Sequence, residues 1–240
     1  MLDTTFNTMP SPRKTCPLPD QRGGHWYWQT ESSRASILFV GRGSYSDRSE
    51  VLDAVSTEPP AEVAWVKQIH SNRFVSAIKG FSGEGDALTT SQDRLALSVA
   101  TADCVPIVLV GEKDLAVIHA GWRGIASGIA TKTMAALNAS PTTLTAWIGP
   151  SIGPCCYEVG PEVAEQVAAA ASPEVVRDRG SERPTIDLAR AVNAQLTAMG
   201  LRRIHTLECC TRCNDQWLSS YRREGPAAAR NFTFAWLQRT

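Results

Sequence analysis

The chain has 240 residues, of which 43% are hydrophobic and 20% charged, a balance typical of a globular protein with a sizeable core. Basic and acidic side chains number 24 each, so the formal net charge is zero. This neutrality offers no electrostatic attraction for nucleic acid or a membrane surface, and no apolar stretch reaches the roughly 18 residues that a membrane span needs. The composition therefore favours a small molecule or a protein as partner.

The first 24 residues are rich in Pro, Ser and Thr and lack the apolar core of a secretory signal. We expect a loose leader over residues 1–24 and a single domain over residues 25–240. The chain contains seven cysteines, and an odd number without a secretory signal argues against a disulfide framework. Reduced thiols and a cytoplasmic location are the resulting expectations.

Short runs rich in Val and Ile and bounded by Gly, Pro or Asp predict eight strands. In chain order they are ASILFVG, EVAWVKQIH, LALSVATAD, VPIVLVG, LAVIHAG, LTAWIGP, IHTLECC and NFTFAWL. Apolar residues at helical spacing predict helices over residues 124–139, 160–171 and 186–200. Several strands follow one another directly between residues 61 and 119. This order favours an α+β domain with mixed sheets over a doubly wound parallel sheet.

Three of the predicted strands end in side chains that bind metals. His119 ends one buried run, His70 ends another, and Asp103 and Cys104 follow a third. Functional groups collect at such ends because a sheet holds them rigidly while the loop tips stay open. The glycines that follow His119 would let the chain turn tightly and approach a ligand closely.

Two imidazoles and one thiolate form a donor set that suits zinc. Three protein ligands leave a fourth position for water, whose pKa zinc lowers to roughly 7. The residues alone also permit a purely structural role without a metal, because a histidine at a strand end is often held by hydrogen bonds. The long spacing between His70, Cys104 and His119 matches no local zinc signature.

The remaining cysteines carry a weaker signal. Cys210 and Cys213 have a spacing known from zinc and redox sites, but zinc would need two further ligands, and His205 is the one nearby histidine. We therefore expect no second metal. Cys155 and Cys156 precede a predicted helix, and we expect their thiols to be buried.

Six motifs occur in an order that resembles a known family. They are KQIH, GDALTT, TADCVPIVL, IHAGWRG, IGPSIGPCCYEVG and CCTRCN followed by SYRREG. Together, over residues 60–237, they resemble the YfiH-type laccase-domain family, also called the polyphenol oxidase or purine nucleoside phosphorylase family. The resemblance implies a layered α/β/β/α fold with mixed sheets. It also implies a metal triad of His70, Cys104 and His119 holding zinc, with copper as the alternative.

The implied activity is phosphorolysis of adenosine, inosine and 5′-methylthioadenosine to the base and the (thio)ribose 1-phosphate, together with deamination of adenosine. Asp86 and Asp103 are the candidates for moving protons. Their alternative roles are a turn residue beside a glycine and a cap on a turn. Arg123, at a predicted helix start near Gly124, is the first candidate for holding phosphate.

Arg222 and Arg223 are weaker phosphate candidates, since adjacent arginines are usually a solvated pair. The family's Gly-Gly-Val-Ser segment and Leu-Asn-Leu run are replaced here by FVGRGSYSDRSE, a change that bears on substrate preference if this loop shapes the pocket.

Other functions remain open on the sequence. A metal-free hydrolase would use Cys104 as nucleophile and His119 as base. The same site would serve an enzyme that edits peptidoglycan precursors, or persist as a vestige in a partner-binding protein. A copper-dependent polyphenol oxidase is disfavoured, because laccase chemistry needs several coppers and more histidines than the four present.

Overall fold

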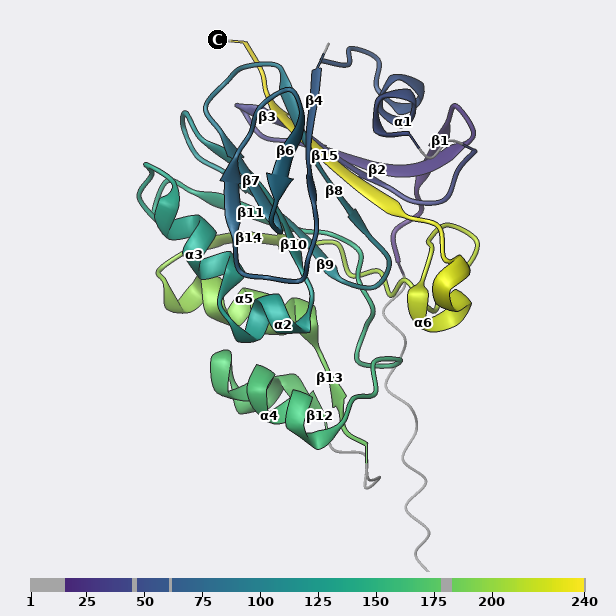
Figure 1. Ribbon diagram of the computed structural model, residues 1–240, viewed down its shortest axis with the longest axis vertical. Coiled ribbons are helices and arrows are strands. Elements are labelled where there is room, and N and C mark those ends of the chain that lie inside the picture. The colour runs from purple at the N-terminus through teal and green to yellow at the C-terminus, as the bar shows by residue number, and fades with distance from the viewer. Residues whose placement is uncertain (1–15, 45–46, 61, 178–182, 240) are drawn as a thin grey trace, which may run out of the picture.

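The computed structural model describes residues 16–44, 47–60, 62–177 and 183–239. Two β-sheets lie face to face, with α1 on the outer side of one and α2 to α5 on the outer side of the other (Figure 1). The helices are α1 (Arg48–Val55), α2 (Trp122–Ala126), α3 (Ile129–Ala136), α4 (Pro161–Ala170), α5 (Leu188–Ala198) and α6 (Tyr221–Glu224), with 3-10 turns η1 (Pro173–Val175) and η2 (Gly225–Ala227). The predicted layered α/β/β/α arrangement in one domain is confirmed.

Both large sheets are mixed. The first has the spatial order β1 (Asp20–Arg22), β2 (His25–Glu31), β3 (Ala35–Val40), β15 (Asn231–Leu237), β8 (Leu95–Thr101), β4 (Glu62–Lys67) and β6 (Gly80–Glu84). The second has the order β14 (Arg203–Thr206), β11 (Thr145–Ile148), β9 (Val105–Val110), β10 (Leu115–Ala120), β7 (Ala87–Thr90) and β5 (Phe74–Ser76). A small ribbon joins β12 (Val176–Arg177) and β13 (Thr185–Ile186). All eight predicted strands are present.

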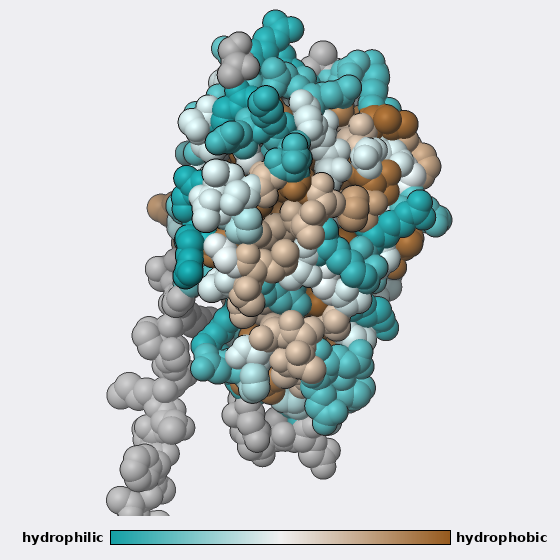
Figure 2. Space-filling view, turned by 90° about the vertical axis from the view of Figure 1, so that its left-hand side faces the viewer, coloured by the Kyte–Doolittle hydropathy of each residue, from teal (hydrophilic) through white to brown (hydrophobic). Residues whose placement is uncertain are grey.

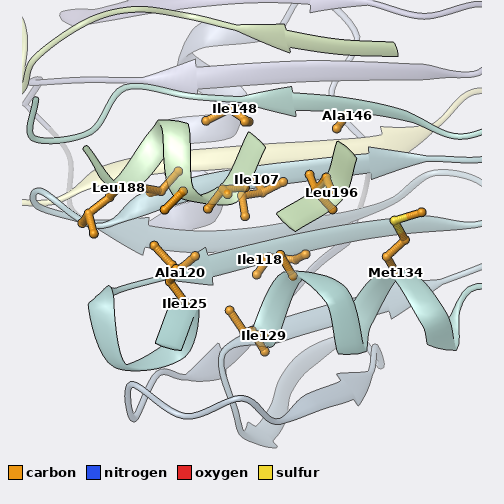
Figure 3. Close-up of a cluster of buried hydrophobic side chains, with 14 of the residues drawn as sticks. Ile107, Ile118, Ala120, Ile125, Ile129, Met134, Ala146, Ile148, Leu188 and Leu196 are labelled. Carbon is orange, nitrogen blue, oxygen red and sulfur yellow. The ribbon is translucent and has the colours of Figure 1, made fainter. Parts of the chain in front are cut away.

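The alternation of side chains along each strand separates three hydrophobic clusters. In β9, Ile107 and Leu109 face the helices, whereas Val108 and Val110 face the first sheet. Figure 3 shows Ile107 and other sheet side chains meeting residues from the helices, including Leu196 of α5. The third cluster lies between α1 and the outer face of the first sheet.

Helix α1 is an element that the sequence pattern did not indicate. Val51, Leu52 and Val55 are its buried residues and pack on the first sheet. Its N-terminus is capped by Asp47, whose side chain accepts hydrogen bonds from the amides of Ser49 and Glu50. Three buried apolar residues in a helix of eight leave too little periodicity to detect.

The predicted helix over residues 124–139 is wrong in its continuity and its start. The chain forms α2 and then α3, because Gly128 between them takes a left-handed conformation with φ 78°. Helix α2 begins at Trp122, so Arg123 lies inside its first turn and not in the loop before it.

Regular structure begins nearer the N-terminus than the expected domain boundary at residue 25. Strand β1 lies within residues 1–24 and pairs with β2, and the carbonyl of Pro17 accepts a hydrogen bond from Trp28 Nε1 at 2.9 Å. Cys16 forms a disulfide with Cys209, which corrects the expectation of reduced thiols for this pair. Their separation of 193 residues gives no local signal. Residues 1–15 lie outside the described part of the chain.

No helix among the described residues is long and apolar enough to cross a membrane. Figure 2 shows the face on the left-hand side of Figure 1, where hydrophilic residues surround smaller apolar groups.

The packing of the hydrophobic core predicts how substitutions change the stability of the protein. Replacement of the fully buried Ile118 by Ala is expected to lower the free energy of unfolding by roughly 2–5 kcal/mol, because a cavity replaces packed methyl groups. Replacement of Ile118 by Val should lower it by about 0.5–1.5 kcal/mol. Ile78 is 61% exposed, and Ile78→Ala should change it by no more than about 0.5 kcal/mol. Urea unfolding measures all three. Similar losses at both positions would contradict the assignment of Ile118 to the core.

Candidate metal centre

Three strand ends bring His70, Cys104 and His119 together. Strands β4 and β8 are parallel neighbours, so the segments that follow them, carrying His70 and Cys104, leave the same edge of the first sheet. Strands β9 and β10 are antiparallel, and His119 pairs with Pro106 near the start of β9. One ligand atom from each of the three residues therefore lies within 4.8 Å of the other two. The distance from Cys104 Sγ to His70 Nε2 is 4.0 Å.

The backbone of His70 is held in an uncommon conformation, with φ 57°. The carboxylate of Asp86 offsets this strain by accepting hydrogen bonds from the loop around His70. The donors are the amides of Ile69, His70 and Ser71, at 3.4, 3.0 and 2.6 Å, and the Ser71 hydroxyl at 2.7 Å. Asp86 thus fixes the loop that carries the first histidine.

Asp86 also orients the second histidine. Its Oδ1 lies 2.8 Å from Nδ1 of His119, and both side chains are buried. Burial raises the pKa of Asp86, but hydrogen bonds from His119 and Ser71 outweigh it and bring the pKa to about 2. An ionised carboxylate at Nδ1 keeps the proton on that nitrogen. Nε2 of His119 is then the atom available to a metal.

The charges of Cys104 and His119 are coupled. Burial raises the pKa of the Cys104 thiol, but the charge of His119 and hydrogen bonds from both histidines bring it to about 6. Burial lowers the pKa of His119, but the Cys104 charge and Asp86 bring it to about 9. Without a metal, the pair is a thiolate and an imidazolium at neutral pH.

Gly121 is required by the close approach of two ligands. A Cβ at this position would lie 3.0 Å from His70 Cδ2 and 3.1 Å from Cys104 Sγ, distances that force a neighbour to move. The glycine directly after β10 therefore leaves the space in which the ligands converge. This is the physical reason for the glycine turn behind His119.

The donor set fits a zinc ion. Tetrahedral zinc with ordinary bond lengths separates a thiolate sulfur from an imidazole nitrogen by about 3.6 Å, close to the 4.0 Å between Cys104 and His70. The Asp86–His119 hydrogen bond is the outer-shell contact typical of histidine ligands. Copper accepts the same ligand types.

Asp103 lies beside Cys104 in a left-handed conformation with φ 95°. Its buried carboxylate accepts hydrogen bonds from the Thr211 hydroxyl at 2.6 Å and from the Arg222 amide at 2.7 Å. Its carbonyl accepts from the Ile152 amide at 2.9 Å. Asp103 therefore joins the strand end to two later loops.

Tyr157 is a residue of the site that sequence reasoning missed, although it stands in the GPCCYEVG motif. Burial raises its pKa to about 12, and the Cys104 charge acts in the same direction. The guanidinium of Arg222 lies 5.0 Å from the ring centroid. Arg123, the first candidate for phosphate, is exposed and stacks on the Trp122 ring at 4.4 Å.

The positive charges of Arg123 and Arg222 both act on Tyr157. Both positive charges lower the pKa of Tyr157, against the larger effects of burial and Cys104. Of the two, Arg222 is the one in direct contact with Tyr157. Arg222 additionally donates to the carbonyl of Glu158 at 2.9 Å, which fixes its side chain. Arg223 instead donates to the carbonyls of three residues, Thr211, Arg212 and Leu218.

Comparison with known proteins gives relatives over most of the chain. A purine nucleoside phosphorylase of Clostridium acetobutylicum is 31% identical over 184 residues, 72% of this chain and 76% of the relative. One from Aquifex aeolicus is 37% identical over 160 residues, 65% of this chain and 74% of the relative. The crystal structure of a Neisseria meningitidis protein superposes with a TM-score of 0.76 and 26% identity, covering 89% of this chain and 99% of that one.

The family model described as multi-copper polyphenol oxidoreductase laccase matches residues 45–238. This range contains all three residues of the candidate metal centre, the whole of the second sheet, and the first sheet except β1, β2 and β3. The match spans most of the chain and agrees with the relatives and with the fold. The chain belongs to this laccase-like family, whose members include the YfiH proteins.

Proposed function

We propose that the protein is a zinc-dependent purine nucleoside phosphorylase acting at His70, Cys104 and His119. The observation that carries the proposal is the convergence of these three ligand atoms within 4.8 Å of one another. The charge of Cys104 acts on the buried Tyr157, over whose ring Arg222 lies. The names of the relatives support purine nucleosides and phosphate as substrates. Adenosine, inosine and 5′-methylthioadenosine are the proposed substrates, with deamination of adenosine to inosine and ammonia as a second reaction.

In phosphorolysis, an oxygen of hydrogen phosphate forms a bond to the anomeric carbon of the sugar. The bond from that carbon to the base nitrogen breaks, its electron pair stays with the base, and the proton of hydrogen phosphate passes to the base. A bound zinc ion would supply Lewis acidity at this place. Arg123 and Arg222 would hold the phosphate by charge-assisted hydrogen bonds.

We assign positioning roles to Asp86 and Asp103, which the sequence suggested as proton carriers. Asp86 is fully buried and accepts hydrogen bonds from His119 and from the loop at His70. Both carboxylate oxygens of Asp103 also accept hydrogen bonds, from Thr211 and Arg222. These contacts support a role in holding the centre and its neighbouring loops in place.

The positions of the other two histidines weigh against laccase chemistry. His25 is buried in β2, and His205 in β14 stacks on the ring of Trp147 at 5.4 Å. Within the described residues, neither belongs to a group of side chains that could share a metal with the centre. A cluster of several coppers would need more imidazoles than His70 and His119 provide.

A chromatographic product assay tests the proposal. With adenosine and phosphate, the purified protein should release adenine and ribose 1-phosphate, and His119→Ala should abolish this product because it removes a ligand. Arg123→Ala should raise the KM for phosphate about 10–100-fold, the loss expected for charge-assisted hydrogen bonds. Phosphate-independent inosine formation should change less.

Arg202→Ala is the matched control for Arg123→Ala, because Arg202 is also exposed and follows α5. It should leave both reactions unchanged. Absence of base release from adenosine, inosine and 5′-methylthioadenosine in zinc-loaded protein would overturn the proposed function. An equal fall of both reactions in Arg123→Ala would overturn the role of Arg123 alone.

Removal of the Asp86 charge tests the orientation of His119. Asp86→Asn should weaken zinc binding at the centre roughly 10–100-fold, the usual cost of losing an outer-shell partner of a ligand histidine. Competition with a chelator measures the affinity. Asp53→Asn, on α1 and away from the centre, is the control and should bind zinc as the unaltered chain does. Unchanged affinity in Asp86→Asn would contradict the positioning role.

The thiolate–imidazolium pair supports one second candidate, a metal-free hydrolase with Cys104 as nucleophile. In metal-free protein, alkylation of Cys104 should follow a pH profile centred near 6, since the folded-state pKa lies below its ordinary value. Replacement of His119 by Ala should move the profile to higher pH, because the favourable charge is lost. Peptide mass spectrometry distinguishes Cys104 from the other thiols.

Two results would decide between the candidates. Activity that persists in metal-free protein and disappears on alkylation of Cys104 would favour the hydrolase. Activity that is lost with the metal and restored by zinc would favour the phosphorylase. An alkylation profile centred at the ordinary thiol value of about 8.5 would remove the basis for the hydrolase.

A further inference from the structure

Four cysteines outside the candidate metal centre converge in a second cluster. Cys155 and Cys156 lie on the loop after β11, and Cys210 and Cys213 lie beyond β14. Their four sulfur atoms all lie within 4.8 Å of one another. Cys213 Sγ is 3.6 Å from Cys155 Sγ and 3.4 Å from Cys156 Sγ.

This cluster corrects two expectations. The sequence predicted no second metal, because zinc at Cys210 and Cys213 would need two further ligands. Cys155 and Cys156 lie where those ligands are needed. The thiols of Cys155 and Cys156 were expected to be buried, but Cys155 is exposed and Cys156 is half-buried. A separation of more than 50 residues hid the juxtaposition from any local motif.

Backbone contacts hold the two halves of the four-cysteine cluster together. Ser151 and Cys210 form a parallel β-bridge, in which the Ser151 amide donates to the Cys209 carbonyl and the Thr211 amide donates to the Ser151 carbonyl, each at 3.1 Å. The cluster is therefore part of the folded framework and does not depend on chance contact of two loose loops.

Each half is shaped by a tight turn. The amides of Cys156 and Tyr157 both donate to the Gly153 carbonyl, at 2.9 and 3.1 Å. In the other half, the Cys210 carbonyl accepts from the amide of Asn214 at 3.1 Å and from its side chain at 2.8 Å. These turns bring consecutive or closely spaced cysteines to one point.

Gly153 provides both space and a hydrogen bond to sulfur. A Cβ at this residue would lie 3.3 Å from Cys155 Sγ and from Cys210 Cβ. Its amide donates to Cys210 Sγ at 3.2 Å, a contact that stabilises negative charge on the sulfur. An amide aimed at sulfur and a missing side chain are features of a built thiolate site.

The spacing of the sulfur atoms matches a metal. Zinc bound to four thiolates at about 2.3 Å sets neighbouring sulfurs about 3.8 Å apart, near the 3.4 and 3.6 Å found here. A disulfide would need about 2.05 Å between two of them. We propose that Cys155, Cys156, Cys210 and Cys213 bind one zinc ion in a closed tetrahedral site.

Four protein ligands leave no position for water or substrate, so the ion has a structural role. It would cross-link the two loops that hydrogen-bond to Asp103, the neighbour of Cys104. Ile152 and Thr211, each near a ligand in the chain, both hydrogen-bond to Asp103. Tyr157 directly follows Cys156. The second site thus holds the loops that contact the residue beside Cys104.

The metal content of a variant without the first site tests the proposal. His70→Ala combined with His119→Ala removes two ligands of the first site and leaves all seven cysteines. Purified in a reducing, zinc-containing medium, this double variant should retain one zinc per chain. Further replacement of Cys213 by Ser should release it, whereas Cys16→Ser, which alters a cysteine outside the cluster, should not.

Cobalt gives a spectroscopic signature of the ligands. Cobalt-loaded double variant should show the intense sulfur-to-metal charge-transfer absorption of a four-thiolate tetrahedral site, and the band should disappear with Cys213→Ser. Alkylation followed by mass spectrometry should find the four thiols protected until a chelator is added. These readouts do not depend on enzyme activity, so they are independent of the proposed function.

Three results would overturn the second site. The first is a double variant that holds no stoichiometric zinc. The second is disulfides among the four cysteines after purification under reducing conditions. The third is zinc that persists in the Cys213→Ser variant. The double variant with an intact cluster also decides the question where Cys213→Ser fails to fold, because its zinc content and cobalt spectrum do not need that substitution.

Discussion

The buried carboxylate of Asp86 is the interaction on which the candidate metal centre depends. It accepts hydrogen bonds from Nδ1 of His119 in β10 and from the amide of His70 in the loop after β4, so one charged group sets the positions of two ligands. A buried carboxylate without partners would be costly, and five donors offset the loss of water here. The uncommon backbone of His70 is the local strain that this arrangement supports.

The sheets explain why such an arrangement is available. Parallel neighbours β4 and β8 release their chains at one edge, and the antiparallel pair β9 and β10 belongs to the other sheet. The short segment from Asp103 to Cys104 crosses between the two sheets, so it lies where ligands from both can meet. A rigid layer on each side then holds the ligand atoms with little freedom, which is what a metal requires of its protein.

Sequence patterns predicted the eight core strands, an α+β domain with mixed sheets, and His70, Cys104 and His119 as candidate ligands, because each rests on local apolar runs and their ends. They did not predict α1, whose apolar periodicity is too short, or the break at Gly128, where a residue common in turns interrupts an apolar stripe. They missed Tyr157 and the four-cysteine cluster because both depend on loops brought together by the fold. Resemblance to a family added the layered α/β/β/α arrangement and the grouping of the three ligands in one metal site, which spacing alone left open.

The metal ligands and the loops that hydrogen-bond to Asp103 are held by different means. His119 lies in a paired strand and Asp86 holds the loop of His70, whereas the segments around Tyr157 and Cys210 are joined by isolated bridges, such as that between Ser151 and Cys210. Five of the seven cysteines lie in these two loop segments, where extra cross-links contribute most. A loop loses more conformational entropy on ordering than a strand that is already paired. The concentration of cysteines in these segments is expected if a disulfide and a zinc–thiolate site hold the loops where strand pairing does not.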